Sequence, residues 1–122
     1  MRFAYLFAAF AILASSTFCP AHAAYVDGND LFRHCEAGEN SRNYYQDQAY
    51  CLAYVVSAAD YLEIQRSIDS KPRCIPAGVP PIQLVDIVRK FLKDNPDKRH
   101  WDAPALVINA TIRAFCLPPV TQ

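Results

Sequence analysis

The residue types best suited to covalent chemistry in this 122-residue sequence are its five cysteines and three histidines. His34 directly precedes Cys35, which suggests a cysteine nucleophile with a histidine base. Neighbouring positions on a helix diverge by about 100°, however, so these two side chains do not face each other. The sequence contains no CxxC or HExxH pattern and no glycine-rich phosphate loop. We therefore expect no catalytic residue, no metal site, no cofactor and no enzymatic activity.

The N-terminal segment has the features of an export signal. Arg2 is followed by an apolar run over residues 3–14, which is shorter than the roughly 20 residues that span a bilayer. Ala21 and Ala23 place small side chains at the two positions that a signal peptidase reads. We predict a signal peptide over residues 1–23, a mature domain over residues 24–122 and a periplasmic location.

Removal of the signal peptide takes Cys19 away and leaves an even number of cysteines. In an oxidising compartment such a set indicates two disulfides. Four cysteines permit three pairings, and the sequence alone does not choose among them. We favour the two pairs that each join a helix to the segment against which it must pack, Cys35 with Cys51 and Cys74 with Cys116.

The charge balance bears on the class of partner. The chain carries 12 basic and 12 acidic residues, so neither nucleic acid nor an anionic membrane surface is indicated. No second apolar run approaches membrane-spanning length. We expect a soluble protein, with no nucleic acid partner and no membrane association after signal cleavage.

Apolar spacing predicts an all-α, small four-helix bundle-like domain with two disulfides. The first helix has Asn29 as its N-cap and ends near Ala37. The second follows residues 39–42, and a period near 3.6 predicts its inner stripe. This stripe comprises Tyr45, Ala49, Leu52, Val56, Ala59 and Leu62, widened by Cys51 and Val55. The same helix carries a cluster of tyrosines, Tyr44, Tyr45, Tyr50, Tyr54 and Tyr61. They form either an interface or a cover over the core.

Residues 71–81 are rich in proline and are predicted to form a rigid loop anchored by Cys74. The third helix begins with Pro81 at its first position. Its inner face comprises Leu84, Ile87, Val88, Phe91 and Leu92. The fourth helix follows Asp102 as N-cap, with Pro104 in its first turn. Its predicted inner stripe comprises Ala105, Ile108, Ile112 and Phe115.

Four segments taken in order resemble one family. They are residues 28–31 before Cys35, residues 51–55 with Asp60, residues 74–79 with Gln83 and Leu84, and residues 98–100 with Ala105. Together they resemble the Rap/Tai family, periplasmic immunity proteins that neutralise peptidoglycan amidase effectors of type VI secretion. The resemblance covers nearly the whole mature chain. The family has glycine where Ser57 stands and proline where Phe115 stands, and neither departure touches the cysteines.

The resemblance implies a helical homodimer that plugs the cleft of a secreted amidase with a protruding loop and an adjacent helix surface. The polar turn between the third and fourth helices is the candidate loop, with partner-binding residues Asn95, Asp97, Lys98, Arg99 and His100. The charges of this turn are expected to be too exposed to matter for folding. The loop at residues 73–80 is the second candidate, although its disulfide anchor suggests a structural role.

A second reading comes from another class of protein. Small size and two disulfides are also typical of periplasmic stress-related helpers, which bind clients loosely as chaperones and have no toxin partner. A neighbouring gene for a small Cys-His amidase would favour the inhibitor. Monomerisation in acid with loose client binding would favour the helper.

Overall fold

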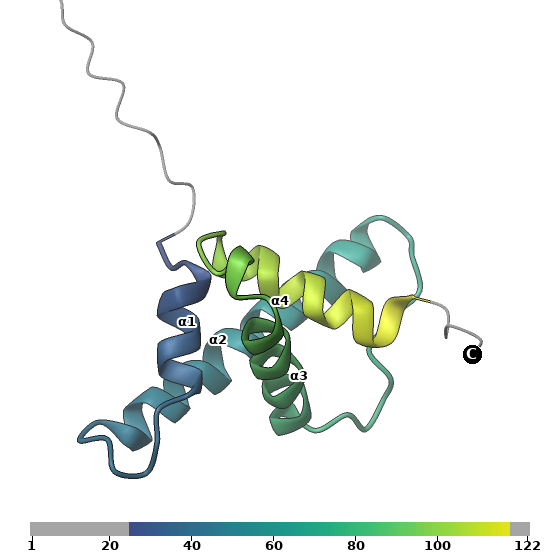
Figure 1. The fold of residues 1–122 in the computed structure, drawn as a ribbon. Helices are drawn as coiled ribbons and strands as arrows, with labels where there is room; N and C mark the ends of the chain where they lie inside the picture. Colours follow the sequence, from purple (N-terminus) through teal and green to yellow (C-terminus); the bar gives the residue numbers. More distant parts are fainter. Residues whose placement is uncertain (1–24, 118–122) are drawn as a thin grey trace, which may run out of the picture.

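A computed structural model describes residues 25–117 of the chain, so the predicted signal peptide lies outside the described residues. These residues form helices joined by loops and contain no strand (Figure 1). The elements in chain order are α1 (Gly28–Cys35), α2 (Tyr44–Ile68), α3 (Pro81–Asp94), the 3-10 turn η1 (Pro96–Lys98), α4 (Ala103–Thr111) and the π-helical turn η2 (Ile112–Cys116). The predicted all-α domain with four helices is confirmed.

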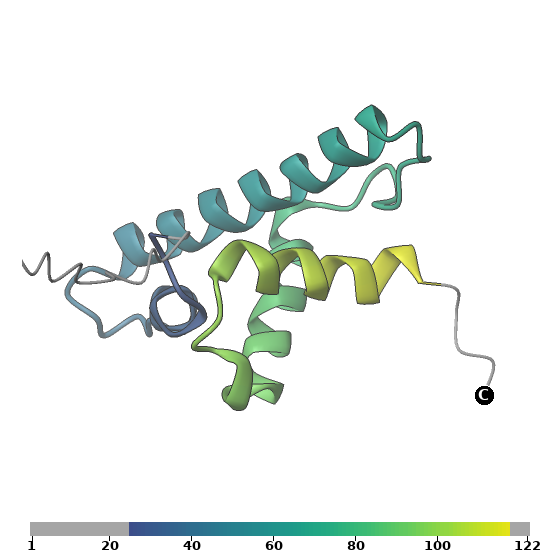
Figure 2. The same cartoon turned by 90° about the horizontal axis from the view of Figure 1, so that it is seen from above.

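The longest helix, α2, organises the packing. In Figure 2 it runs along one side of the molecule, and α1, α3 and α4 lie on the other side of it. The helices share one core, whose largest fully buried side chains include Leu31, Val55, Val88, Leu92 and Leu106. No helix among residues 25–117 has the length and apolar character needed to cross a bilayer.

Helix α1 begins two residues earlier than expected. Its N-cap is Asp27 rather than Asn29, because Asp27 has an extended backbone and its side chain accepts a hydrogen bond of 2.8 Å from the backbone N–H of Asp30. The helix ends at Cys35, two residues before the expected end at Ala37.

The predicted inner stripe of α2 is wrong in its first half. Tyr45 and Leu52 are 85% and 38% exposed, and Ala49 is exposed as well. The buried residues of this helix are Cys51, Val55, Ala58, Ala59, Leu62 and Glu63. The disulfide from Cys51 to α1 turns that side of α2 inward, and a shift of one residue rotates a helical stripe by about 100°. Of the predicted stripe, Ala59 and Leu62 are buried, and so are Cys51 and Val55, which were predicted to widen it.

The face of α3 was predicted well, whereas that of α4 was not. Pro81 is the first residue of α3, and Leu84, Val88 and Leu92 are buried, as is Val85. In α4 the buried residues are Ala103, Leu106, Val107, Ala110 and Thr111, while Ala105 is exposed. Apolar residues surround almost the whole of α4, so its sequence offers little contrast from which to choose the inner face.

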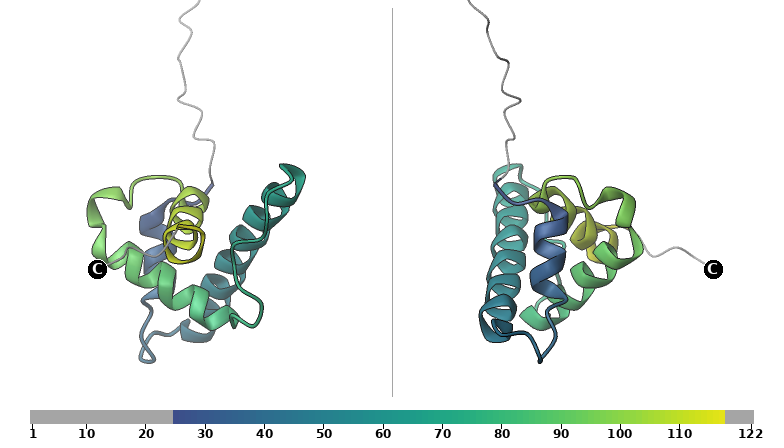
Figure 3. Two further views of the ribbon diagram at one scale, coloured as in Figure 1. Left: turned by 90° about the vertical axis from the view of Figure 1, so that its right-hand side faces the viewer. Right: turned by 60° about the vertical axis from the view of Figure 1, so that its left-hand side comes forward.

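Both predicted disulfide pairings are confirmed. Cys35–Cys51 joins α1 to α2 inside the core, where both cysteines are buried. Cys74–Cys116 joins the proline-rich loop to the end of η2, and both of its cysteines are half-buried. Figure 3 shows this loop leaving the end of α2 and returning to the start of α3.

Candidate partner-binding site

The turn between α3 and α4 is built by hydrogen bonds among its own residues. The Asn95 side chain donates to the carbonyl of Phe91 at 2.8 Å and so caps the end of α3. The Lys98 ammonium donates to the Asn95 side-chain oxygen at 2.7 Å. Between them, Pro96 opens the 3-10 turn η1, with its φ fixed by the ring. Two of the predicted partner-binding residues, Asn95 and Lys98, therefore also shape the turn.

Arg99 lies beneath this turn, half-buried, rather than out in solvent. Its Nε donates to the carbonyl of Leu92 at 2.7 Å, and its NH2 donates to the carbonyl of Lys93 at 3.3 Å. Its guanidinium carbon lies 3.6 Å from the centroid of the Phe32 ring on α1. The guanidinium thus satisfies carbonyls at the C-terminus of α3 and packs against α1. The expectation that Arg99 is too exposed to matter for folding is wrong.

The start of α1 is joined to the same turn by backbone hydrogen bonds. Gly28 N–H donates to the Trp101 carbonyl and Asn29 N–H to the Arg99 carbonyl, each at 2.9 Å. A third bond runs in the opposite direction, from Ala103 N–H to the Val26 carbonyl at 3.0 Å. We call these three backbone hydrogen bonds the seam between α1 and the turn. A Cβ at Gly28 would lie 2.8 Å from the Arg99 carbonyl oxygen and would collide with the Leu106 side chain. Glycine is therefore required at residue 28 for this close approach.

Three side chains of the turn remain available to a partner. Asp97 and His100 are exposed, and Trp101 is 46% exposed. The rings of His100 and Trp101 meet edge to face, with centroids 6.1 Å apart. Trp101 was not among the predicted binding residues, although the only tryptophan of the chain, placed beside a polar turn, was a usable signal. The turn is thus held from below by Arg99 and presents an acid, an imidazole and an indole.

The second candidate, the proline-rich loop, is tied down by Glu63 of α2. One carboxylate oxygen of Glu63 accepts hydrogen bonds from Cys74 N–H at 3.1 Å and Ile75 N–H at 2.9 Å. The other oxygen lies 3.3 Å from Arg73 Nε. Burial alone would raise the pKa of Glu63, but these N–H groups and the Arg73 charge outweigh burial, and the pKa is lowered.

The sequence did not reveal the role of Glu63. Its only visible signal was an acidic residue one position after the predicted core residue Leu62, and nothing in the sequence indicates that it faces a loop ten residues later. The contacts of this carboxylate fall on backbone and on Arg73, so they anchor the loop.

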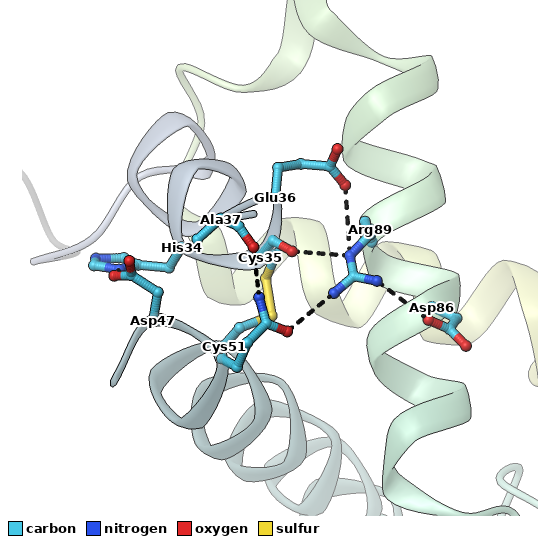
Figure 4. The surroundings of a disulfide bond; sticks show 9 residues. His34, Cys35, Glu36, Ala37, Asp47, Cys51, Asp86 and Arg89 are labelled. Carbon is cyan, nitrogen blue, oxygen red and sulfur yellow. Dashed lines mark hydrogen bonds and ion pairs between the residues drawn. A yellow bond between two sulfur atoms is a disulfide. The ribbon is translucent and has the colours of Figure 1, made fainter. Parts of the chain in front are cut away.

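Figure 4 shows the surroundings of the disulfide between Cys35, the candidate nucleophile of the sequence, and Cys51. His34 Nδ1 lies 2.7 Å from the Asp47 carboxylate, and its ring is tilted by 39° against that of Tyr50, with centroids 4.3 Å apart. Both sulfur atoms are bonded to each other. Cys35 is therefore a structural residue, and His34 joins α1 to α2 through Asp47.

Arg89 of α3 holds the chain that leaves this disulfide. Its Nε donates to the Cys35 carbonyl at 2.9 Å, and its NH2 lies 3.4 Å from the Gln48 side-chain oxygen (Figure 4). Ion pairs to Glu36 and Asp86 complete its surroundings. Between residues 25 and 117, no group of three or more histidine, cysteine or acidic side chains is placed to hold a metal ion.

Comparisons with known proteins agree with the resemblance seen in the sequence. No curated protein and no solved structure matches the chain. The family described as Rap1a immunity proteins matches residues 27–116, which include both disulfides and every helix that the structure describes between residues 25 and 117. The chain belongs to the family of Rap1a immunity proteins.

Proposed function

We propose that this protein is a periplasmic immunity-type inhibitor that binds a peptidoglycan amidase effector of type VI secretion and blocks access of substrate to it. Membership of the Rap1a immunity family supports the immunity class. Two disulfides suit an oxidising compartment. A homodimer, as the resemblance implies, belongs to the same proposal.

The observation that carries the proposal is the construction of the α3–α4 turn. Its backbone is fixed by α1 and by the Arg99 guanidinium, yet Asp97, His100 and Trp101 stand free of those contacts. A turn that is already ordered loses little conformational entropy when a partner closes around it. Tryptophan also supplies a large, rigid contact area, and it is enriched among residues that dominate binding energy.

A plug of this kind inhibits by occupying space and needs no reacting group. A small amidase must admit a peptidoglycan stem peptide to its catalytic cleft. A rigid turn seated in that cleft excludes the peptide. We therefore expect inhibition that substrate competes against, with the apparent KM raised and kcat unchanged at saturating substrate.

The proposal is tested with the mature protein and the amidase encoded by the neighbouring gene. In the double variant Asp97→Ala/His100→Ala we expect inhibition at least 10-fold weaker, about 1.4 kcal/mol. Its thermal unfolding should be nearly unchanged, because both side chains are exposed and only the Asp97–Lys98 ion pair, at 3.6 Å, is lost. The matched control, Glu39→Ala/Arg42→Ala, removes an exposed acid and an exposed base from the α1–α2 loop and should leave both measurements unchanged.

The variant Arg99→Ala distinguishes residues that support the turn from residues that contact the amidase. It should lower the unfolding temperature, because two α3 carbonyls and the Phe32 ring lose their partner. Wild-type inhibition by Asp97→Ala/His100→Ala would contradict the placement of the binding surface on this turn. Sedimentation of the mature protein measures the proposed homodimer in the same samples.

A further inference from the structure

An open groove of about 450 Å³ lies between α2 and the first turn of α4. Its lining residues are Tyr50, Ala53, Tyr54, Ser57, Ala58, Tyr61 and Pro104. Small side chains at 53, 57 and 58 leave a shallow floor, and tyrosine rings stand along it. Six of the seven belong to α2, at the three- and four-residue steps that place side chains on one face of a helix.

The tyrosines of the groove are ordered by contacts yet remain open to solvent. The rings of Tyr50 and Tyr54 stack with centroids 5.8 Å apart, and the Tyr61 hydroxyl accepts a hydrogen bond of 3.1 Å from Gln65. Tyr50 is 37% exposed and Tyr61 is 54% exposed. Tyrosine presents a wide surface at low entropic cost, which makes such a face suited to an apolar partner.

The charges around the groove are acidic. From Tyr44 to Gln65, α2 carries Asp47, Asp60 and Glu63 and no lysine or arginine. Asp102 lies two residues before Pro104, which lines the groove. Burial, Tyr50 and the charge of Asp102 all raise the pKa of the Tyr54 hydroxyl, in that order of size. Asp47 is paired with His34 and Glu63 with Arg73. Asp60 and Asp102 are both exposed and have no ion-pair partner within 4 Å among residues 25–117.

The groove is continuous with the turn that we propose to enter the amidase. Trp101 is the last exposed side chain of the turn, Asp102 follows it in the chain, and Pro104 already lines the groove. A partner that surrounds the turn therefore reaches the groove without crossing another element of the fold.

We propose that this groove docks a segment of the effector in which apolar side chains are flanked by lysine or arginine. The inference rests on the proposed function, because it assigns the groove to the same partner as the turn. A second copy of the chain fits less well, since pairing the two grooves would bring the unpaired Asp60 and Asp102 carboxylates of both copies together. The homodimer then uses another face.

The test uses two short synthetic peptides with the mature, disulfide-bonded protein. Each peptide has a central Leu-Phe-Leu sequence, flanked by lysine pairs in one and by glutamate pairs in the other. We expect the lysine peptide to bind saturably and to shift the amide NMR signals of residues 50–61. The glutamate peptide should bind at least 10-fold more weakly.

Two variants assign the binding to the groove. Ser57→Arg fills the floor with a long basic side chain and should abolish binding of the lysine peptide. The control, Asn109→Arg, adds the same side chain to an exposed position of α4 outside the groove and should bind the lysine peptide as wild type does. Circular dichroism checks that both variants fold.

Three outcomes overturn the inference. They are equal binding of the two peptides, shifts that fall outside residues 50–61 and 102–105, and a wild-type dimer that Ser57→Arg converts to monomer. None of them depends on inhibition of the amidase. If Ser57→Arg loses the peptide but Asp97→Ala/His100→Ala still inhibits as wild type does, the groove stands and the turn fails. The reverse pattern leaves the proposed function intact without the groove.

Discussion

The two connections that enclose α3 are both rigid, but they are made rigid by different means. The proline-rich loop before α3 is held by the Cys74–Cys116 disulfide and the buried carboxylate of Glu63. The turn after α3 is held by hydrogen bonds to α1 and by the Arg99 guanidinium, with no covalent bond of its own.

The difference shows what each connection can offer a partner. In the loop, the anchoring contacts fall on the backbone of Cys74 and Ile75, so the loop itself is what is stabilised. In the turn, the anchors lie underneath, and Asp97, His100 and Trp101 are left free above them. Rigidity alone therefore does not identify a binding element. A binding element is identified by the exposed side chains that take no part in anchoring it.

The largest expected effect comes from breaking the covalent anchor of the loop with Cys74→Ala/Cys116→Ala. The sequence separation of 42 residues corresponds to about 4 kcal/mol of stability in the chain-entropy account. Inhibition of the amidase by the folded fraction should be unchanged, because the turn makes no contact with this disulfide. Urea unfolding and inhibition assays at low temperature check the two parts. Loss of inhibition by folded protein would assign binding to the loop.

The non-covalent seam of the turn is broken by Gly28→Ala. The new methyl group meets the Arg99 carbonyl and Leu106, and such overpacking costs about 1–3 kcal/mol. Because the seam also positions the turn, inhibition should weaken even at temperatures where the variant is folded. The control is Gly38→Ala, where a Cβ meets nothing within 4 Å and stability should change by less than about 0.5 kcal/mol. Equal behaviour of the two variants would show that the seam does not set the turn.

The sequence predicted the framework of both connections and missed what holds them. The prolines and cysteines predicted the rigid loop, the disulfide that anchors it and the start of α3, because these residues act through local geometry and covalent bonds. The roles of Glu63 and Arg99 depend on segments brought together only by folding. In the sequence, a glutamate and an arginine look the same whether they are exposed on the surface or hold two segments together. The predicted inner face of α2 was wrong for a related reason. Its exposed face is rich in tyrosine and leucine, and an apolar pattern does not distinguish these residues from core residues.

The pH dependence of the loop anchor follows from Glu63. Its pKa is lowered in the folded protein, so its contribution is present above the unfolded pKa of about 4.3 and is lost as pH falls through the folded value. Glu63→Gln should therefore cost about 1–2 kcal/mol at pH 7, and the difference from wild type should shrink below about pH 4. Urea unfolding at both pH values measures it. Asp60→Asn, an exposed acid on the same helix, is the control. A gap that stays constant with pH would exclude the charge of Glu63 as the cause.

The smallest expected effect is a gain in stability at the point where the loop leaves α2. Ser70 has φ of +56°, and Gly78 near the other end has φ of +88°, whereas no residue of the α3–α4 turn has positive φ. Ser70 follows the C-cap Asp69, the position at which helices commonly end in the left-handed conformation with glycine. That conformation costs a residue with a Cβ roughly 1–2 kcal/mol. Ser70→Gly should thus stabilise the protein by about 0.5–1 kcal/mol, after the greater freedom of glycine in the unfolded chain is subtracted.

The reverse substitution, Gly78→Ser, should destabilise it by a similar amount, since nothing lies within 4 Å of the new Cβ and only the backbone conformation is strained. Urea midpoints of the two variants give the comparison directly. If both move in the same direction, the backbone of the loop is not held in the left-handed region at its two ends, and its rigidity comes from the disulfide and Glu63 alone.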